Sequence, residues 1–170
     1  FMILGQLVQP PTGNTFDDST IIGAAGNPAI TALTVRSGDV LDALQAVNTG
    51  TTSANTGAGG ADLYTLLQHG GNGGAAQTLT IAAGDPIVAI SGFTGLWYGW
   101  PCVLQLTLTT RSGTTYGPFG SMSGSAAQTP FAQIAPAGQS VVAFSGTTLT
   151  VPLAGGSSTS IIGSLNAVFG

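Results

Sequence analysis

Charged residues are nearly absent from this sequence. They make up 5% of the 170 residues, neither Lys nor Glu occurs, and the only cations are Arg36 and Arg111. Nucleic-acid binding needs several cations that neutralise phosphates, and attachment to an anionic membrane surface needs a basic cluster. The composition therefore argues against a nucleic-acid partner and rules out a polybasic membrane anchor.

Residues for acid–base chemistry and metal binding are just as scarce. The chain has one histidine, His69, and one cysteine, Cys102. A hydrolytic site would have to use His69, which stands beside a glycine turn with no nucleophile motif. Cys102 can form no internal disulfide and is interpreted as a small buried hydrophobic residue. We therefore predict that the protein is not an enzyme.

No metal or cofactor site is predicted either. The sequence has no His/Cys cluster that would hold zinc. Asp39 and Asp42 are close in sequence, but two carboxylates fall well short of the about six to eight oxygens that calcium takes. The carboxylates of the chain are Asp17, Asp18, Asp39, Asp42, Asp62 and Asp85.

Long apolar runs are missing, although the mean hydropathy is +0.41. Gly, Ser and Thr interrupt the apolar residues, and no run approaches the roughly 20 residues that span a bilayer. We therefore expect no membrane insertion. Phe1 and Met2 are not followed by a basic segment and a long apolar one, so no signal peptide is predicted. A mature secreted form would look the same, and the compartment, secreted or cytoplasmic, stays open.

Short segments rich in Val, Ile, Leu and Thr, separated by Gly, Ser, Asn and Pro, fill most of the chain. Examples are "AITALTVRSG", "AQTLTIAAGD", "CVLQLTLTTRS" and "SVVAFSG". This pattern predicts an all-β sandwich, barrel or prism. The segment "ADLYTLLQH" is compatible with a helix by propensity, but it is short and runs directly into a glycine turn.

Internal similarity predicts three related units. Residues 31–44 align without a gap with residues 77–90, and residues 81–92 align with residues 135–146. A spacing of roughly fifty residues between repeats predicts threefold pseudosymmetry, with three sheets round one apolar core. The bends of the three units fall near Gly38, Gly84 and Gly138.

The glycine-rich stretch "HGGNGG", His69 to Gly74, requires an explanation because glycine is costly to order. A strand from Asp42 to about Asn48 and an antiparallel partner from about Asp62 to Gln68 form a hairpin in this interpretation. The start of the first strand then lies beside the end of the second. "SGDVLD" and "HGGNGG" are therefore predicted neighbours, with the Asp42 carboxylate facing backbone N–H donors. This combination suits a polyhydroxylated ligand.

The order of motifs resembles the jacalin-related lectins over most of the chain. It reads "TFDD…ALTVRSGDVLDAL…HGGNGG…GDPIVAISGFTG…YGPFG…TPF…VVAFSG". "YGPFG" followed by "TPF" is the most specific part, and "SGDVLD" is similar to the banana-lectin-like, mannose-type members. The resemblance implies a type I β-prism of three four-stranded antiparallel sheets. It also implies metal-free sugar binding at one end of the prism, and a homo-oligomer.

The resemblance implies a sugar site in the first unit. There Asp42 would accept hydrogen bonds from the sugar hydroxyls O4 and O6. The N–H groups of Asp39 and Val40 would donate to O5 and O6, and that of Gly74 to O3. The residues assigned to this site are Gly38, Asp39, Val40, Leu41, Asp42, Gly70, Gly71, Gly73 and Gly74.

The two other sites that the family's architecture offers depart from its pattern. The N-terminal loop "VQPPTGN", residues 8–14, has prolines where glycines are expected. The C-terminal motif, residues 156–163, places Ser160 at the position of the family's Asp. In the middle unit, "GPFGSMSG" and the strand from Cys102 to Gln105 provide no Asp. One strong site per chain is therefore expected.

Several alternatives stay open. The loop "GLWYGW" places Trp97, Tyr98 and Trp100 either in an extended sugar subsite or in the core or an oligomer interface. His69 is expected to pack against or cap the glycine loop, and Asp17 and Asp18 to be structural. The interpretation that the motifs favour is one jacalin-like domain over residues 1–170 that binds mannose- or glucose-containing glycans or glycoproteins. The alternative is a β-prism interaction module with degenerate sugar sites.

Overall fold

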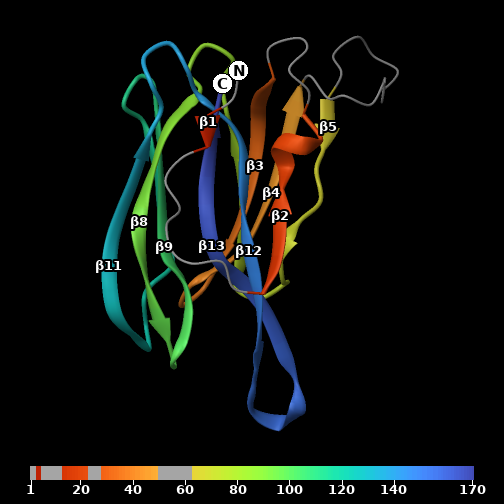
Figure 1. The fold of residues 1–170 in the computed structure, drawn as a ribbon, viewed down its shortest axis with the longest axis vertical. Helices are drawn as coiled ribbons and strands as arrows, with labels where there is room; N and C mark the ends of the chain where they lie inside the picture. The colour runs from red at the N-terminus through yellow and green to blue at the C-terminus, as the bar shows by residue number, and fades with distance from the viewer. Residues whose placement is uncertain (1–2, 5–12, 23–27, 50–62) are drawn as a thin grey trace.

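The computed structural model describes residues 3–4, 13–22, 28–49 and 63–170 (Figure 1). In these residues the chain forms β-strands and two short 3-10 turns, η1 (Asp18–Thr20) and η2 (Ala154–Gly156). No helix in the described ranges is long and apolar enough to cross a membrane. The predicted all-β class is confirmed, and the described part of "ADLYTLLQH" forms two short strands with an irregular stretch between them and no helix.

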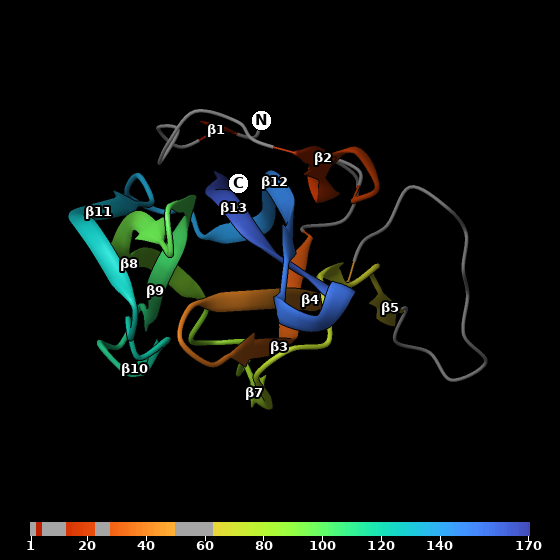
Figure 2. The ribbon, with the colours of Figure 1, turned by 90° about the horizontal axis from the view of Figure 1, so that it is seen from below.

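Three antiparallel sheets form the three sides of a prism (Figure 2). One sheet has the order β1 (Ile3–Leu4), β13 (Ser158–Phe169), β12 (Val141–Pro152), β2 (Asn14–Asp17). The second has the order β10 (Thr115–Phe119), β9 (Trp100–Thr110), β8 (Ile87–Trp97), β11 (Ser125–Ile134). The third has the order β5 (Leu63–Thr65), β4 (Leu41–Thr49), β3 (Ala29–Ser37), β7 (Ala75–Thr80), and β6 (His69–Gly70) also pairs with β4. The predicted β-prism is confirmed.

The third sheet differs from the prediction in one detail. The expected single strand ending at Gln68 is divided into β5 and β6, which pair with opposite ends of β4. Leu66 lies between them with its side chain fully in the core, 1% exposed. Its N–H still donates to the carbonyl oxygen of Ala46 in β4 at 2.9 Å, but the regular pairing with β4 resumes only at His69. The predicted neighbourhood still holds, because Ala43 pairs with Gly70.

All three sheets contribute to one apolar core. Leu33, Leu106 and Leu165, one from each sheet, are 0% exposed and belong to the same cluster. Burying a side chain of this size stabilises the fold by about 1.5–3 kcal/mol. A second, smaller cluster joins Val40 to residues of the two other sheets. Its buried members are Val40, Cys102, Leu104, Val151 and Ile161.

The internal repeat is confirmed in one of its two alignments. Residues 81–92 and 135–146 each lead from one sheet into the central hairpin of the next. Gly92 of β8 and Gly146 of β12 both pair with a leucine of the following strand. The other alignment is wrong. Gly38 lies inside the β3–β4 hairpin, whereas Gly84 connects two sheets. Turns of both kinds select Gly and Asp, which produced the similarity.

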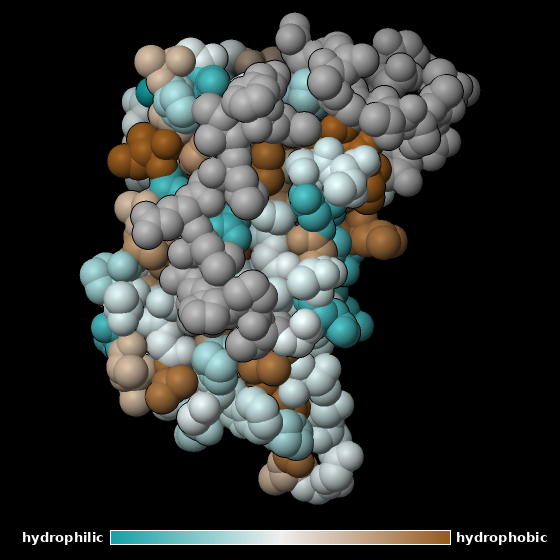
Figure 3. Space-filling model, in the orientation of Figure 1, coloured by the Kyte–Doolittle hydropathy of each residue, from teal (hydrophilic) through white to brown (hydrophobic). Residues whose placement is uncertain are grey.

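The central hairpins β3–β4, β8–β9 and β12–β13 run side by side along the prism. The β12–β13 hairpin, blue in Figure 1, extends beyond the two others at the end that carries the β3–β4 turn. On the face shown in Figure 3, hydrophobic residues are scattered among polar ones and form no single continuous area.

Candidate functional site

Asp42 lies at a β-bulge near the start of β4. Arg36 pairs with Ala43, but the next residue of β3, Ser37, pairs with Leu41, so Asp42 has no partner across the ladder. Bulges of this kind redirect a side chain and are common beside functional sites. The Asp42 side chain is 7% exposed. The bulge therefore holds a nearly buried carboxylate at the end of the prism.

The glycine loop after β6 packs directly on this carboxylate. A Cβ placed on Gly73 would lie 2.8 Å from Asp42 Oδ1, and one on Gly74 would lie 2.6 Å from Asp42 Oδ2. Gly74 also has a φ of 64°, which favours glycine. A side chain at either position would displace the carboxylate. Gly38 and Gly74 are close together, as predicted from the sequence. A Cβ placed on Gly38 would lie 3.6 Å from the Cα of Gly74.

Gly70 and Gly71 contact neighbouring backbone, unlike Gly73 and Gly74, which lie against the Asp42 carboxylate. Gly70 has a φ of 100° and lies against the backbone of Asp42 and Ala43. The N–H of Gly71 donates to the carbonyl oxygen of Ser160 at 2.9 Å and lies 3.3 Å from that of Asp42. The first half of the loop therefore fixes it to β4 and β13, and only the second half borders the carboxylate.

Burial raises the pKa of Asp42 from its ordinary value of 3.8 to about 6. The nearby Asp39 carboxylate raises it further, while the N–H of Gly38 and the charge of Arg36 lower it. Desolvation disfavours the charged form of a carboxyl group. The ionised carboxylate is thus available near neutral pH, and it gains from any ligand that donates hydrogen bonds to it.

Backbone donors lie beside this acceptor. The N–H of Gly38 donates to the carbonyl oxygen of Val40 at 3.1 Å. Within the described residues, the hydrogen bonds that fix the loops do not use the N–H groups of Asp39, Val40 and Gly74. Val40 and Leu41 are buried, at 1% and 0% exposed, whereas Gly74 is exposed. A charged acceptor beside free donors can match neighbouring hydroxyl groups.

The loop between β10 and β11 supports the β3–β4 turn. Ser121 N–H donates to the carbonyl oxygen of Gly38 at 2.9 Å, and Met122 N–H donates to that of Asp39 at 2.8 Å. Under the turn, Val40 packs with Cys102 in the smaller apolar cluster. The pKa of the Cys102 thiol is raised to about 12. Burial is the larger cause, and the nearby Asp42 carboxylate is the second. Cys102 is therefore a neutral packing residue, as predicted, and not a nucleophile.

The three aromatic residues of the β8–β9 turn differ in their exposure to solvent. Trp97 packs against the smaller cluster, and its indole Nε1 is buried. Of the two alternatives left open for Trp97, this half-buried packing favours the core role. Tyr98 and Trp100 are 71% and 36% exposed. Tyr98 N–H donates to the carbonyl oxygen of Gly124 at 3.2 Å, which joins this turn to the loop that supports Asp39.

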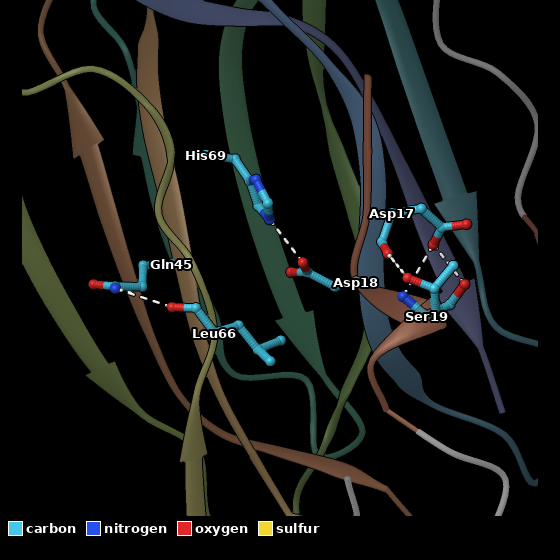
Figure 4. Close-up of polar contacts among 7 residues, drawn as sticks. Asp17, Asp18, Ser19, Gln45, Leu66 and His69 are labelled. Carbon is cyan, nitrogen blue, oxygen red and sulfur yellow. Dashed lines mark hydrogen bonds and ion pairs between the residues drawn. The ribbon is translucent and has the colours of Figure 1, made fainter. Parts of the chain in front are cut away.

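His69 joins the glycine loop to the turn after β2 (Figure 4). Its Nε2 lies 2.7 Å from Asp18 Oδ1, and its ring stacks on Phe16 with 4.0 Å between the centroids. Asp18 is 3% exposed. Asp17 accepts a hydrogen bond from Ser19 N–H and caps η1. The packing role predicted for His69 and the structural roles of Asp17 and Asp18 are confirmed.

Ser160 lies in β13, and the residues from Cys102 to Gln105 lie in β9; neither strand contains an Asp. Of the N-terminal loop at residues 8–14, residues 8–12 lie outside the described part, as do residues 50–62 between the two strands of the predicted hairpin. In the described ranges, no group of three or more His, Cys, Asp or Glu residues could hold a metal ion.

Three residues near the carboxylate were not predicted from the sequence. Arg36 Nε donates to the carbonyl oxygen of Gly73 at 3.1 Å, and Gln68 Nε2 donates to that of Gly71 at 3.0 Å. A Cβ on Gly73 would also lie 3.3 Å from Thr159 Oγ1, so the long β12–β13 hairpin borders the loop. The one signal available in the sequence was that Arg36 is one of only two cations.

Comparison with known proteins places the chain in a family. The family model described as "Jacalin-like lectin domain" matches residues 8–151. No curated protein sequence matches the chain. Among solved structures, AcmJRL, a mannose-binding jacalin-related lectin from Ananas comosus, is 25% identical with a TM-score of 0.67. The match covers 99% of this chain and 96% of that one.

Two further structures show the same fold at lower identity. The Malaysian banana lectin is 23% identical with a TM-score of 0.66, and the match covers 100% of this chain and 97% of that one. Artocarpin, in a complex with mannopentose, is 17% identical with a TM-score of 0.72 and coverages of 99% and 97%. The family model covers most of the sequence, and the three sheets follow the same prism. The chain belongs to the jacalin-like lectin domain family.

Proposed function

We propose that this protein is a metal-independent, carbohydrate-binding lectin that recognises mannose- or glucose-type glycans through Asp42 and the glycine loop. The single observation that carries the proposal is the contact of the Asp42 carboxylate with Gly73 and Gly74. Glycine lets a sugar ring approach the backbone, and a carboxylate forms strong hydrogen bonds with hydroxyl donors. Ananas comosus AcmJRL, a structural relative, is described as mannose-binding, which supports the choice of sugar.

In this proposal Asp42 accepts hydrogen bonds from O4 and O6 of one sugar. The N–H groups of Asp39, Val40 and Gly74 donate to its other oxygens. Galactose has the inverted configuration at O4, which points that hydroxyl away from Asp42. The lost bond to a charged group costs about 1.5–3 kcal/mol. A preference for mannose and glucose over galactose of roughly tenfold to a hundredfold is therefore expected.

Titration calorimetry in EDTA, with methyl α-mannoside and methyl α-galactoside, tests the proposal. We expect binding of the mannoside, a weaker response to the galactoside, and one site per chain. Tighter binding of the galactoside would contradict the assignment of O4 and O6 to Asp42. Binding that needs added calcium would contradict the metal-free mechanism. The expected stoichiometry depends on the two departures from the family's pattern: Ser160 replaces its Asp in the last unit, and the strand from Cys102 to Gln105 has no Asp in the middle unit.

We further infer that residues 1–170 act as one lectin domain without enzymatic activity. A single shallow site is weak, so useful avidity requires several chains that bind one branched glycan. A homo-oligomer is part of this proposal. The charge-poor exterior, with two cations in the whole chain, is compatible with association.

Tyr98 and Trp100 are proposed as an extended subsite for a second sugar. Tyr98 is strongly exposed and has a φ of 46°, a backbone conformation that is uncommon for a residue other than glycine or asparagine. Strained positions are frequent at binding sites. The second candidate function is a β-prism interaction module without sugar binding. The loss of the carboxylate at Ser160 favours it, and a glycan array with no response would support it.

A further inference from the structure

Four consecutive carbonyl groups of the glycine loop accept hydrogen bonds from only two side chains. Arg36 Nη2 donates to Asn72 O at 2.8 Å and to Gly74 O at 3.3 Å, and Arg36 Nε donates to Gly73 O at 3.1 Å. Gln68 Nε2 donates to Gly71 O and to Asn72 Oδ1, both at 3.0 Å. We call this pair of side chains the Arg36–Gln68 bracket. It holds a turn that has no regular strand pairing of its own.

The bracket also fixes where the loop's N–H groups point. In a trans peptide the carbonyl of one residue and the N–H of the next point in opposite directions. The one cis bond in the described residues is Gly117–Pro118, so the loop peptides are trans. The bound carbonyls of residues 71–73 therefore turn the N–H groups of residues 72–74 away from the bracket. Successive N–H groups on one side of a turn form a concave donor surface.

We propose that Arg36 and Gln68 are positioning residues of the sugar site, which present the N–H groups of residues 72–74 as ligand donors beside Asp42. This inference rests on the proposed function. It assigns the ordering of the donor N–H groups to two side chains outside the glycine turn. The bracket bonds to the outer side of the loop, so neither side chain has to touch the ligand. Without it, a loop with three glycines among residues 71–74 would lose its donor geometry to backbone entropy.

Arginine suits this task better than lysine. Its planar guanidinium has donors in a fixed fork, and here three of its hydrogen bonds reach three adjacent carbonyls. The charge of Arg36 also lowers the pKa of Asp42. The other titratable groups that interact with this carboxylate are Asp39 and the thiol of Cys102. Lysine would keep the charge and lose the fork. The two effects of Arg36 can therefore be separated.

The chain provides a matched control in its other cation. Arg111 donates through Nη2 to the carbonyl oxygen of Gln139 at 2.9 Å, in the turn at the far end of β9 from the Tyr98 turn. Arg111→Met removes the same charge without touching the glycine loop. Arg36→Lys, Arg36→Met and Gln68→Ala disturb the bracket to different degrees.

The experiment has two independent parts. In sugar-free protein, ¹⁵N relaxation measures the order of the amides of residues 72–74, and carboxyl NMR follows the titration of Asp42. Calorimetry then measures affinity for methyl α-mannoside. Both Arg36 variants should loosen the amides and weaken binding by about tenfold or more, since correctly placed hydrogen-bond donors are lost. Arg36→Met should raise the Asp42 midpoint, Arg36→Lys should leave it near that of the wild type, and Arg111→Met should change nothing.

Each outcome decides the proposal. Ordered amides and unchanged affinity in Arg36→Met would overturn it, and so would an equal loss of affinity in Arg111→Met. If Arg36→Met does not fold, Arg36→Lys and Gln68→Ala answer the same question. A wild-type protein that binds neither sugar would refute the proposed function. The amide measurement in sugar-free protein would still show whether the bracket orders the loop.

Discussion

The backbone N–H of Gly71 donates to the carbonyl oxygen of Ser160, 2.9 Å away, and so links two sheets of the prism. A Cβ on Gly71 would lie 2.7 Å from that oxygen and 3.0 Å from the backbone nitrogen of Ser160. The loop beside Asp42 is therefore anchored on β13 through the backbone of Ser160.

Gly71→Ala should separate the loop from β13. The new methyl group meets rigid backbone, and overpacking of this kind costs about 1–3 kcal/mol. We expect a lower melting temperature and weaker binding of methyl α-mannoside, measured by thermal unfolding and calorimetry. Gly84→Ala is the control, because a Cβ there meets nothing within 4 Å. Equal melting temperatures for the two variants would refute the anchoring role of Gly71.

Asp42→Asn should abolish measurable sugar binding while the protein stays folded. The exchange keeps the side-chain volume, but it removes the charge and turns one acceptor into a donor. Ser160→Ala keeps the carbonyl that anchors Gly71 and should have little effect. Calorimetry with methyl α-mannoside compares the two variants. Equal losses of affinity from both would show that the site has been placed at the wrong end of the loop.

Binding should weaken in mild acid. Asp42 has a pKa of about 6 in the folded protein, and only its ionised form accepts two sugar hydroxyls. Affinity should be full above about pH 7 and fall about tenfold per pH unit well below 6. Calorimetry between pH 5 and 8 measures this decline. A constant affinity over that range would contradict the role of the Asp42 carboxylate.

The raised pKa of Asp42 affects the stability of the fold in the opposite direction to sugar binding. The folded-state pKa of Asp42 lies above its ordinary value of 3.8, so the folded protein holds this proton more tightly than the unfolded chain does. The stabilisation from Asp42 is therefore present below pH 3.8 and is lost as the pH rises through 6. Asp42→Asn should remove this part of the pH dependence of unfolding. Binding and folding thus respond to Asp42 in opposite directions.

The sequence predicted the fold and the closeness of "SGDVLD" to the glycine stretch because both follow from local pattern. Strand-forming segments mark the sheets, and an antiparallel hairpin forces its two open ends together. The alignment that placed Gly38 with Gly84 failed because it compared a hairpin turn with a connection between sheets. Local composition cannot distinguish the two, since both need Gly and Asp.

What the sequence could not predict depends on contacts between distant segments. The bulge at Asp42 arises from the register of β3 against β4. The hydrogen bonds from Arg36 to the glycine loop span a sequence separation of between 36 and 38 positions. The burial of Trp97 depends on a cluster assembled from all three sheets. Each of these requires the packed prism, and residue type alone does not specify it.

The hydrogen bond between His69 and Asp18 should stabilise the fold. His69→Ala leaves a carboxylate that is 3% exposed without this partner and removes the stacking on Phe16. A lost hydrogen bond to a charged group costs about 1.5–3 kcal/mol, which chemical denaturation can measure. Asp17→Asn is the control, because Asp17 is exposed and, among the described residues, the hydrogen bonds of its side chain come from Ser19. Equal free energies of unfolding for His69→Ala and wild type would refute the role of the pair.

Tyr98 should matter for oligosaccharides and not for a single sugar. The loop that supports Asp39 through Met122 also bonds to Tyr98 through Gly124, and a Cβ on Gly124 would lie 2.6 Å from Tyr98 Cζ. The exposed ring is thus held beside the support of the Asp42 site. An aromatic contact contributes about 0.5–1.5 kcal/mol, so Tyr98→Ala should weaken mannotriose binding roughly two- to tenfold.

Methyl α-mannoside occupies only the Asp42 site, so its affinity should be the same in Tyr98→Ala and wild type. Trp100→Ala should act in the same direction as Tyr98→Ala, and by less, because Trp100 is 36% exposed against 71% for Tyr98. Ile134→Ala is the control for loss of an exposed apolar side chain, since Ile134 is 72% exposed and ends β11 far from the Tyr98 turn. Calorimetry with both ligands decides the question. A fall in monosaccharide affinity equal to that for mannotriose would mean that Tyr98 supports the loop instead of binding a second sugar.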